Sequence, residues 1–282
     1  LDSISPEVPV FILTQMMHQA FVNNAVYKAA EITRDTPDPP GGGTFLKDEQ
    51  GNLNGVIYEF SALQHILKKM PKTPQKTAEL LLNLQYAQYA KAGYTTIAAL
   101  GPVNLAGNPL NFMASLSRNT GVPVRSFVYP LKKQLDSSRW PSGYGNDHFR
   151  IKGVKLYMDG SPYTGGAAFA EPYLNTDVTL TRMELRPNHH GKVNYSEESL
   201  LQTLTKYHNN GYQIAIHAQG EIAIQMILNA FTEILEKYPR PDHRHRLEHN
   251  ALITNNQIIQ AQKLGLTLRF FMDHVYFFSI NI

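Results

Sequence analysis

Three polar side chains of this sequence sit where β-rich runs end, and their types could support metal-assisted chemistry. Lys155 lies in a run whose alternation places Lys155, Tyr157 and Asp159 on one face and apolar residues on the other. His217 and His249 each end one of the next two β-rich runs. Catalytic groups lie at the carboxyl ends of strands in parallel α/β barrels. The order Lys, His, His on three successive strands therefore suits a metal-dependent hydrolase.

Each of these residues also has a structural interpretation. Lys155 and Asp159 could form an ion pair at a strand end, which that strand alone favours over a Lys carbamate that ligates a metal. A lone His217 fits a hydrogen-bonded structural residue as well as it fits a ligand. His249 follows two other His residues within seven positions, a cluster that could itself bind metal. One of them, His245, is expected to share a strand face with His249.

The elements that must position these residues alternate regularly. At four places an amphipathic helix-like run ends in Gly and a β-rich run follows, at Gly93, Gly121, Gly211 and Gly265. Gly supplies the left-handed residue that ends a helix cheaply. Alternating helices and strands predict βαβ units and a parallel sheet. The six predicted strands are residues 95–100, 122–129, 153–159, 212–217, 245–249 and 266–272.

Two parallel folds could use these strands. A closed (β/α)₈ barrel needs eight, so six strands would leave it incomplete. A doubly wound sheet could use six, but no G-x-G-x-x-G follows the first strand. No G-x-S-x-G elbow and no P-loop occurs either, which argues against a serine hydrolase or a nucleotide phosphatase of those types.

Residues 1–60 do not follow the repeat. The breaker Pro-Pro-Gly-Gly-Gly at 39–43 precedes two β-rich runs, 44–47 and 56–59, joined by a polar loop. We therefore predict that residues 1–60 form an inserted segment with a β-hairpin, packed on a partial barrel formed by residues 61–282.

Composition excludes several classes of protein. The 282 residues carry 26 Lys and Arg against 23 Asp and Glu, a net charge of +3, too low for a polybasic nucleic-acid binder. With no Cys, thiolate metal sites and disulfides are impossible. No apolar run approaches the ~18 residues of a membrane span. The first residues lack a signal peptide and an initiator Met, so we expect that the natural N-terminus lies elsewhere. We expect no nucleic-acid or membrane partner and favour the cytoplasm; a homodimer stays open.

Several motifs together resemble the amidohydrolase superfamily, specifically its YtcJ-like branch, amidohydrolase family 3. Residues 153–161, Gly-Val-Lys-Leu-Tyr-Met-Asp-Gly-Ser, resemble the fourth-strand motif of that branch. Residues 216–220, Ile-His-Ala-Gln-Gly, and 244–249, Arg-His-Arg-Leu-Glu-His, resemble the fifth and sixth. The opening of the chain, including His18, and the run 270–276 also match, so the resemblance covers essentially the whole chain.

The resemblance implies a metal-dependent hydrolase with a TIM-type (β/α)₈ barrel. By this resemblance, the catalytic metal ligands are Lys155, as a carbamate, His217 and His249. They would hold one or two divalent ions, which we expect to be zinc. It also suggests His18, Asp159 and His274 as substrate-binding residues. The family's His-x-His pair on strand one and Asp on strand eight have no counterpart here. The chain is therefore expected to be the central part of such a protein, to lack strands 1 and 8, and to be inactive alone.

The function expected from this resemblance is hydrolysis of carbon–nitrogen bonds other than peptide bonds in a small amide-like substrate. A metal-activated water would attack the amide carbon. Two alternatives stay open: an ester or phosphoester hydrolase on the same scaffold, and a catalytically incomplete barrel fragment.

Overall fold

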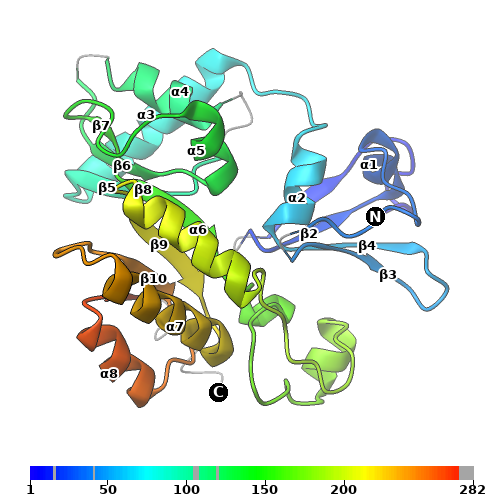
Figure 1. The fold of residues 1–282 in the computed structure, drawn as a ribbon. Coiled ribbons are helices and arrows are strands. Elements are labelled where there is room, and N and C mark those ends of the chain that lie inside the picture. Colours follow the sequence, from blue (N-terminus) through cyan, green and yellow to red (C-terminus); the bar gives the residue numbers. More distant parts are fainter. Residues whose placement is uncertain (15–16, 41, 104–107, 119–120, 273–282) are drawn as a thin grey trace.

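The computed structural model describes residues 1–14, 17–40, 42–103, 108–118 and 121–272, and it separates an antiparallel sheet from a larger parallel region (Figure 1). The antiparallel sheet has the order β1-β2-β4-β3. Its strands are Phe11–Leu13, Gln19–Val22, Leu53–Tyr58 and Thr44–Lys47, in that order. Helices α1 (Asn24–Ala29) and α2 (Phe60–Leu67) pack on it.

The predicted hairpin is present, because β3 pairs with β4 in antiparallel register. The Asp48 side chain organises its turn by accepting hydrogen bonds from the backbone N–H groups of Gln50 and Asn52. This part of the chain also has its own apolar core, which includes Val22, Ile57 and Leu63.

The parallel strands form two hydrogen-bonded groups. One has the order β5-β6-β7, and the other has the order β8-β9-β10-β11. Their bounds are Thr96–Leu100, Arg125–Tyr129, Phe149–Ile151, Gly153–Tyr157, Gln213–Ala218, Arg246–His249 and Thr267–Phe270. The six predicted parallel strands are therefore present, and β7 is a short strand that the sequence analysis missed.

The two groups of parallel strands are joined where β6 ends. The Lys155 N–H donates to the Pro130 carbonyl over 2.8 Å, and Leu131 forms a parallel bridge with Lys155. Only Lys152 separates β7 from β8. The strands thus follow one another in sequence order without the reversal that defines a doubly wound sheet.

Helices cover one face of the parallel strands. They are α3 (Gln75–Lys91), α4 (Pro109–Leu116), α5 (Lys132–Ser138), α6 (Glu197–Asn209), α7 (Glu221–Lys237) and α8 (Asn255–Lys263). Two short turns, η1 (Pro162–Thr164) and η2 (Val178–Arg182), lie in the segment between β8 and α6. All four predicted glycines have positive φ, between 66° and 92°, as a left-handed helix end requires. Among the described residues, no helix is long and apolar enough to cross a membrane.

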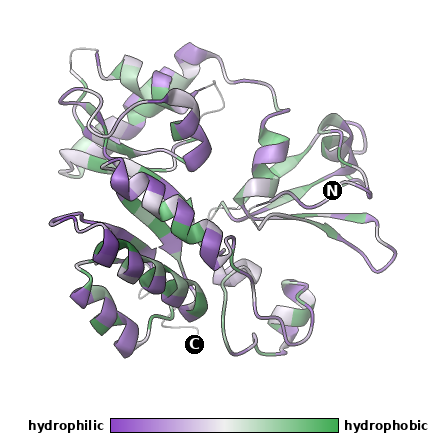
Figure 2. Cartoon of the chain, viewed as in Figure 1, coloured by the Kyte–Doolittle hydropathy of each residue, from purple (hydrophilic) through white to green (hydrophobic). Residues whose placement is uncertain are grey.

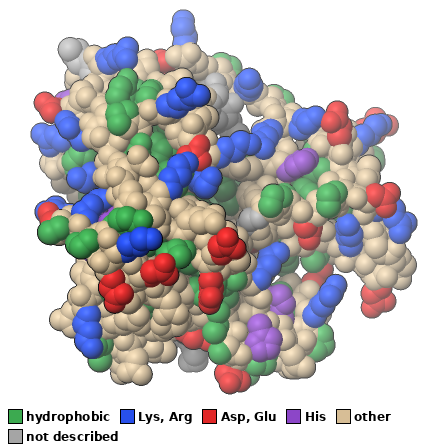
Figure 3. Space-filling model, in the orientation of Figure 1, with side chains coloured by type: hydrophobic (Ala, Val, Ile, Leu, Met, Phe, Trp, Pro, Cys, Tyr) green, Lys and Arg blue, Asp and Glu red, His purple; other side chains and the backbone are tan. Residues whose placement is uncertain are grey.

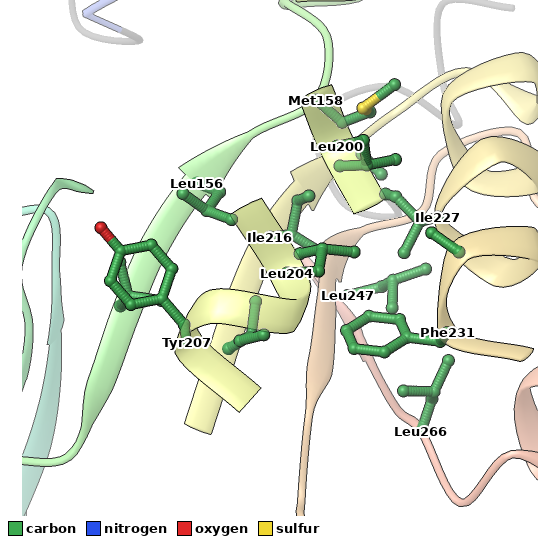
Figure 4. Close-up of a cluster of buried hydrophobic side chains, with 14 of the residues drawn as sticks. Leu156, Met158, Leu200, Leu204, Tyr207, Ile216, Ile227, Phe231, Leu247 and Leu266 are labelled. Carbon is green, nitrogen blue, oxygen red and sulfur yellow. The ribbon is translucent and has the colours of Figure 1, made fainter. Parts of the chain in front are cut away.

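The main core lies between these strands and helices. Leu156 of β8 and Met158, just after that strand, meet Ile216 of β9, Leu204 of α6 and Phe231 of α7, all essentially excluded from solvent (Figure 4). Apolar stripes run along the strands and helices of this region (Figure 2). Because neighbouring residues of a strand point to opposite sides, burying this row aims Lys155 and His217 away from the helices.

The described strands do not close on themselves. Among the described residues, β5 pairs only with β6 and β11 only with β10. A cavity of about 990 Å³ lies between these two edges, lined by β5, by α3 and by residues of β10 and β11. Three exposed leucines lie on α3, at Leu80, Leu81 and Leu84, and Leu81 lines this cavity. A closed barrel is thus not seen within the described residues.

Candidate metal centre

The inner faces of β8, β9 and β10 bring Lys155, His217 and His249 together. In the parallel register, Tyr157 pairs with His217, and His217 pairs with Glu248, the residue before His249. The rings of His217 and His249 are in contact, with centroids 4.6 Å apart. The Lys155 Nζ lies 4.6 Å from the Tyr157 ring centroid, and that ring is 5.3 Å from the ring of His217.

The His217 imidazole is buried and held by one of its nitrogens. Nε2 donates to the Gly160 carbonyl over 3.3 Å and lies 3.8 Å from Oδ1 of Asp159. Burial, with the nearby Lys155 and His249 charges, lowers the pKa of His217 well below its usual value. The neutral ring with Nε2 protonated keeps its lone pair on Nδ1. A metal-binding His commonly donates its other N–H to a carbonyl or carboxylate in this way.

Asp159 stands behind His217. Its buried carboxylate accepts backbone N–H groups of Gln219 (2.9 Å), Gly220 (2.8 Å) and Ala168 (3.2 Å). Burial raises its pKa to about 7, against the lowering effect of these bonds. Asp159 therefore joins the start of α7 to the loop after β8, which is a positioning role. Its predicted contact with substrate stays a prediction.

The environment of Lys155 differs from a simple ion pair. Its side chain is buried, and desolvation lowers its pKa to about 7, opposed by the nearby Glu248 carboxylate. The Asp159 oxygens, which the strand pattern favoured as its partner, bond to backbone instead. With a pKa of about 7, roughly half of the Lys155 amines are neutral at pH 7, and only a neutral amine reacts with CO₂ to form a carbamate.

The sequence suggests that the basic run Arg240, Arg244 and Arg246 is surface charge that pairs with Glu248, but the Arg246–Glu248 pair is buried beside Lys155. Arg246 and Glu248 of β10 pair through two hydrogen bonds, with side chains only 11% and 9% exposed. Arg246 also lies over the Tyr129 ring, 5.6 Å from its centroid. The signal was available, since both residues alternate with the buried Leu247 and so point inward.

His245 lies on the opposite side of the sheet from the candidate centre, so the expectation that it shares a face with His249 is wrong. Its ring packs on Phe231 of α7 at 5.0 Å and bonds to His208 of α6 at 2.9 Å. His245 precedes β10, and His249 leaves the alternation because its φ is +81°. His249 thereby turns toward His217.

The N-terminal segment adds two residues to the site. The His18 ring lies 5.6 Å from that of His217, so this substrate-binding candidate is close to the centre. Its Nδ1 pairs with Oε2 of Glu59 at 2.7 Å. Glu59 follows β4 and carried no recognisable pattern in the sequence. The third substrate-binding candidate, His274, lies outside the described residues.

The side chains at this centre supply some, but not all, of the ligands that a metal ion needs. Among the described residues, no group of three or more His, Asp or Glu side chains is arranged to hold one. The two adjacent imidazoles of His217 and His249 are suitable zinc ligands, and Lys155 could add an oxygen ligand only as a carbamate.

Comparison with known proteins agrees with the resemblance seen in the sequence. A model of the amidohydrolase family matches residues 1–280. The chain is 26% identical over 274 residues to the putative amidohydrolase YtcJ of Bacillus subtilis, covering 95% of this chain and 48% of that protein. It is 24% identical over 287 residues to the N-substituted formamide deformylase of Arthrobacter pascens, covering 95% of this chain and 48% of that protein.

A solved structure shares the fold. It is an uncharacterised metal-dependent hydrolase from Pyrococcus horikoshii, with a TM-score of 0.64 and 22% identity, covering 92% of this chain and 48% of that one. This chain thus spans about half the length of the proteins that it matches.

Proposed function

This chain belongs to the amidohydrolase family, and we propose that it is the central part of a metal-dependent hydrolase that cleaves carbon–nitrogen bonds other than peptide bonds. The observation that carries the proposal is the contact between the His217 and His249 rings at the ends of neighbouring parallel strands, beside the buried Lys155.

In this proposal a divalent metal ion, which we take to be zinc, is held by His217, His249 and a carbamate on Lys155. The ion would lower the pKa of a water and polarise the carbonyl of the substrate. The protein's own residues set up that site. Gly160 and Asp159 fix the His217 ring, and burial keeps both His217 and Lys155 in forms that can become ligands.

We further propose that the parallel strands belong to a (β/α)₈ barrel. Their sequence order and the helices on one face support this arrangement. The edges of β5 and β11, across the cavity of about 990 Å³, are where strands 1 and 8 would pair. The antiparallel segment at residues 1–60 would then be an insertion that supplies His18 to the site.

The chain alone would hold metal weakly and would not catalyse hydrolysis. Its described residues offer two imidazoles and a lysine that is a ligand only after modification, whereas catalytic zinc sites have three protein ligands. On the face in Figure 3, Lys and Arg side chains lie among Asp and Glu side chains.

The first alternative is hydrolysis of an ester or phosphoester on the same scaffold. We favour amides because the formamide deformylase among the relatives is named for a carbon–nitrogen substrate. The second alternative, a barrel without activity, would make the buried Lys155 purely structural.

A substrate panel tests the proposed function. The complete protein, loaded with zinc, is expected to hydrolyse amides and formamides with a kcat/KM well above that for esters and phosphoesters of matched shape. Faster turnover of the phosphoesters or esters would favour the first alternative. No turnover of any panel member by metal-loaded protein would contradict the proposal.

A further inference from the structure

Several contacts fix the geometry of the His18–Glu59 pair, although both residues are distant in the sequence from the strands of the candidate centre. Glu59 has φ 65° and ψ 155°, a backbone region that is essentially reserved for glycine. Its own N–H donates to the His18 carbonyl over 2.7 Å. The pair is thus joined through both backbone and side chain, and strained residues of this kind concentrate at functional sites.

The loop after β8 encloses the Glu59 carboxylate. Oε1 accepts the Ser161 N–H over 3.1 Å and the Thr164 hydroxyl over 2.6 Å. Gly160 and Gly166 pack so closely that a Cβ on either would come within 2.5 Å or 2.7 Å of Oε1. Gly160 also accepts the hydrogen bond from His217. One loop therefore holds both Glu59 and His217.

This arrangement fixes the tautomer of His18. The carboxylate oxygen Oε2 can only accept, so the Nδ1 that lies 2.7 Å from it carries the proton. Neutral His18 then has its lone pair on Nε2, the atom on the opposite edge of the ring. The ring itself lies 5.6 Å from His217 and is 16% exposed at the side chain, so it can meet a substrate there.

We propose that Glu59 is a positioning residue which makes His18 a hydrogen-bond acceptor at the candidate centre, so that the site selects amides that carry an N–H. This inference rests on the proposed function and narrows its substrate class. Secondary amides and formamides donate an N–H, whereas esters and tertiary amides do not. A partly buried acceptor that is left without its donor penalises those substrates.

The variant Glu59→Gln tests the tautomer, because it keeps the shape but replaces an acceptor by an amide. The Gln carbonyl can still accept from Ser161 and Thr164, which places its NH₂ toward His18 and favours the tautomer with Nε2 protonated. Long-range ¹H–¹⁵N NMR of the 282-residue chain reports the two nitrogens, with His18 assigned from His18→Asn. We expect Nδ1–H in the wild type and Nε2–H in Glu59→Gln. The exposed, Lys69-paired Glu31 gives the control Glu31→Gln, which should change nothing.

A proton on Nε2 of neutral His18 in the wild type would overturn the inference, and so would a proton that stays on Nδ1 in Glu59→Gln. The wild-type measurement does not depend on whether a variant folds. In the complete protein, the kcat/KM ratio of a secondary to a matched tertiary amide should fall at least about tenfold in Glu59→Gln. An unchanged ratio would overturn the selectivity. Absence of all amide hydrolysis would instead overturn the proposed function, while the NMR result would still decide the role of Glu59.

Discussion

Replacing His217 by alanine is expected to lower the affinity of this chain for Zn²⁺ or Co²⁺ by more than about 100-fold. Loss of a residue that merely supports a ligand typically costs roughly 10–100-fold in metal affinity or activity, and His217 is proposed as a ligand itself. It is also one of only two imidazoles in ring contact on the inner faces of the described strands β8 to β10.

Calorimetric titration with zinc, and absorption of the cobalt complex, measure this effect. The wild-type chain should bind one ion weakly, and His249→Ala should match His217→Ala. His148 is exposed and provides the control His148→Ala, which should bind as the wild type does. Equal affinity of His217→Ala and the wild type would place the metal elsewhere.

Acid is expected to destabilise the protein strongly through a second group of histidines, behind the sheet. His208 Nε2 donates to the Tyr238 carbonyl, which leaves Nδ1 to accept from His245 Nε2 at 2.9 Å. His245 Nδ1 accepts the Ile214 N–H. His243 stacks on His245 and accepts its backbone N–H. Each of these three imidazoles accepts a hydrogen bond at its Nδ1, so each must be neutral to make that bond.

The sign of the pH effect follows from these contacts. Desolvation first, then the neighbouring His243 and Arg240 charges, lowers the pKa of His245 to about 2. Desolvation also lowers the pKa values of His208 and His243. Below about pH 6.5 the unfolded chain therefore binds more protons than the folded one. The stability contributed by neutral His245 is complete above pH 6.5 and falls by about 1.4 kcal/mol per pH unit below it, or about 3 kcal/mol at pH 4.5.

Urea unfolding at a series of pH values separates this effect from other titrations. His245→Phe keeps the stacking on Phe231 and removes the titrating group, so its stability should change less steeply between pH 4.5 and 6.5, by about 1.4 kcal/mol per unit. His148→Ala should keep the wild-type slope. Parallel slopes for His245→Phe and the wild type would show that His245 is not a neutral buried group.

Local patterns were enough to predict the strands and the direction of most inner-face residues. Period-2 alternation gave the correct direction for the side chains of Lys155 and His217, because the apolar residues that alternate with them in each strand pack on helices. The same rule failed at His245 and His249, where the strand is short and φ turns positive. A one-dimensional pattern carries no information about such a change of backbone region.

The contribution of Glu59 could not be predicted from its neighbours. Its bonding partners Ser161 and Thr164 lie more than 100 positions away, in a loop whose path depends on the whole fold. The buried Arg246–Glu248 pair shows the opposite case. Its inward direction follows from the buried Leu247. Charged residues are rarely fully buried unless they are paired, so the basic run that includes Arg246 suggested a surface position.

Anomalous diffraction from crystals of this chain soaked in millimolar zinc tests whether His217 and His249 bind the metal ion. We expect a zinc peak between β9 and β10, with imidazole nitrogens of His217 and His249 about 2.0–2.1 Å from the ion, and Nδ1 as the ligating atom of His217. Zinc bound elsewhere, with no peak within reach of these two rings, would contradict the assignment of His217 and His249 as the metal centre.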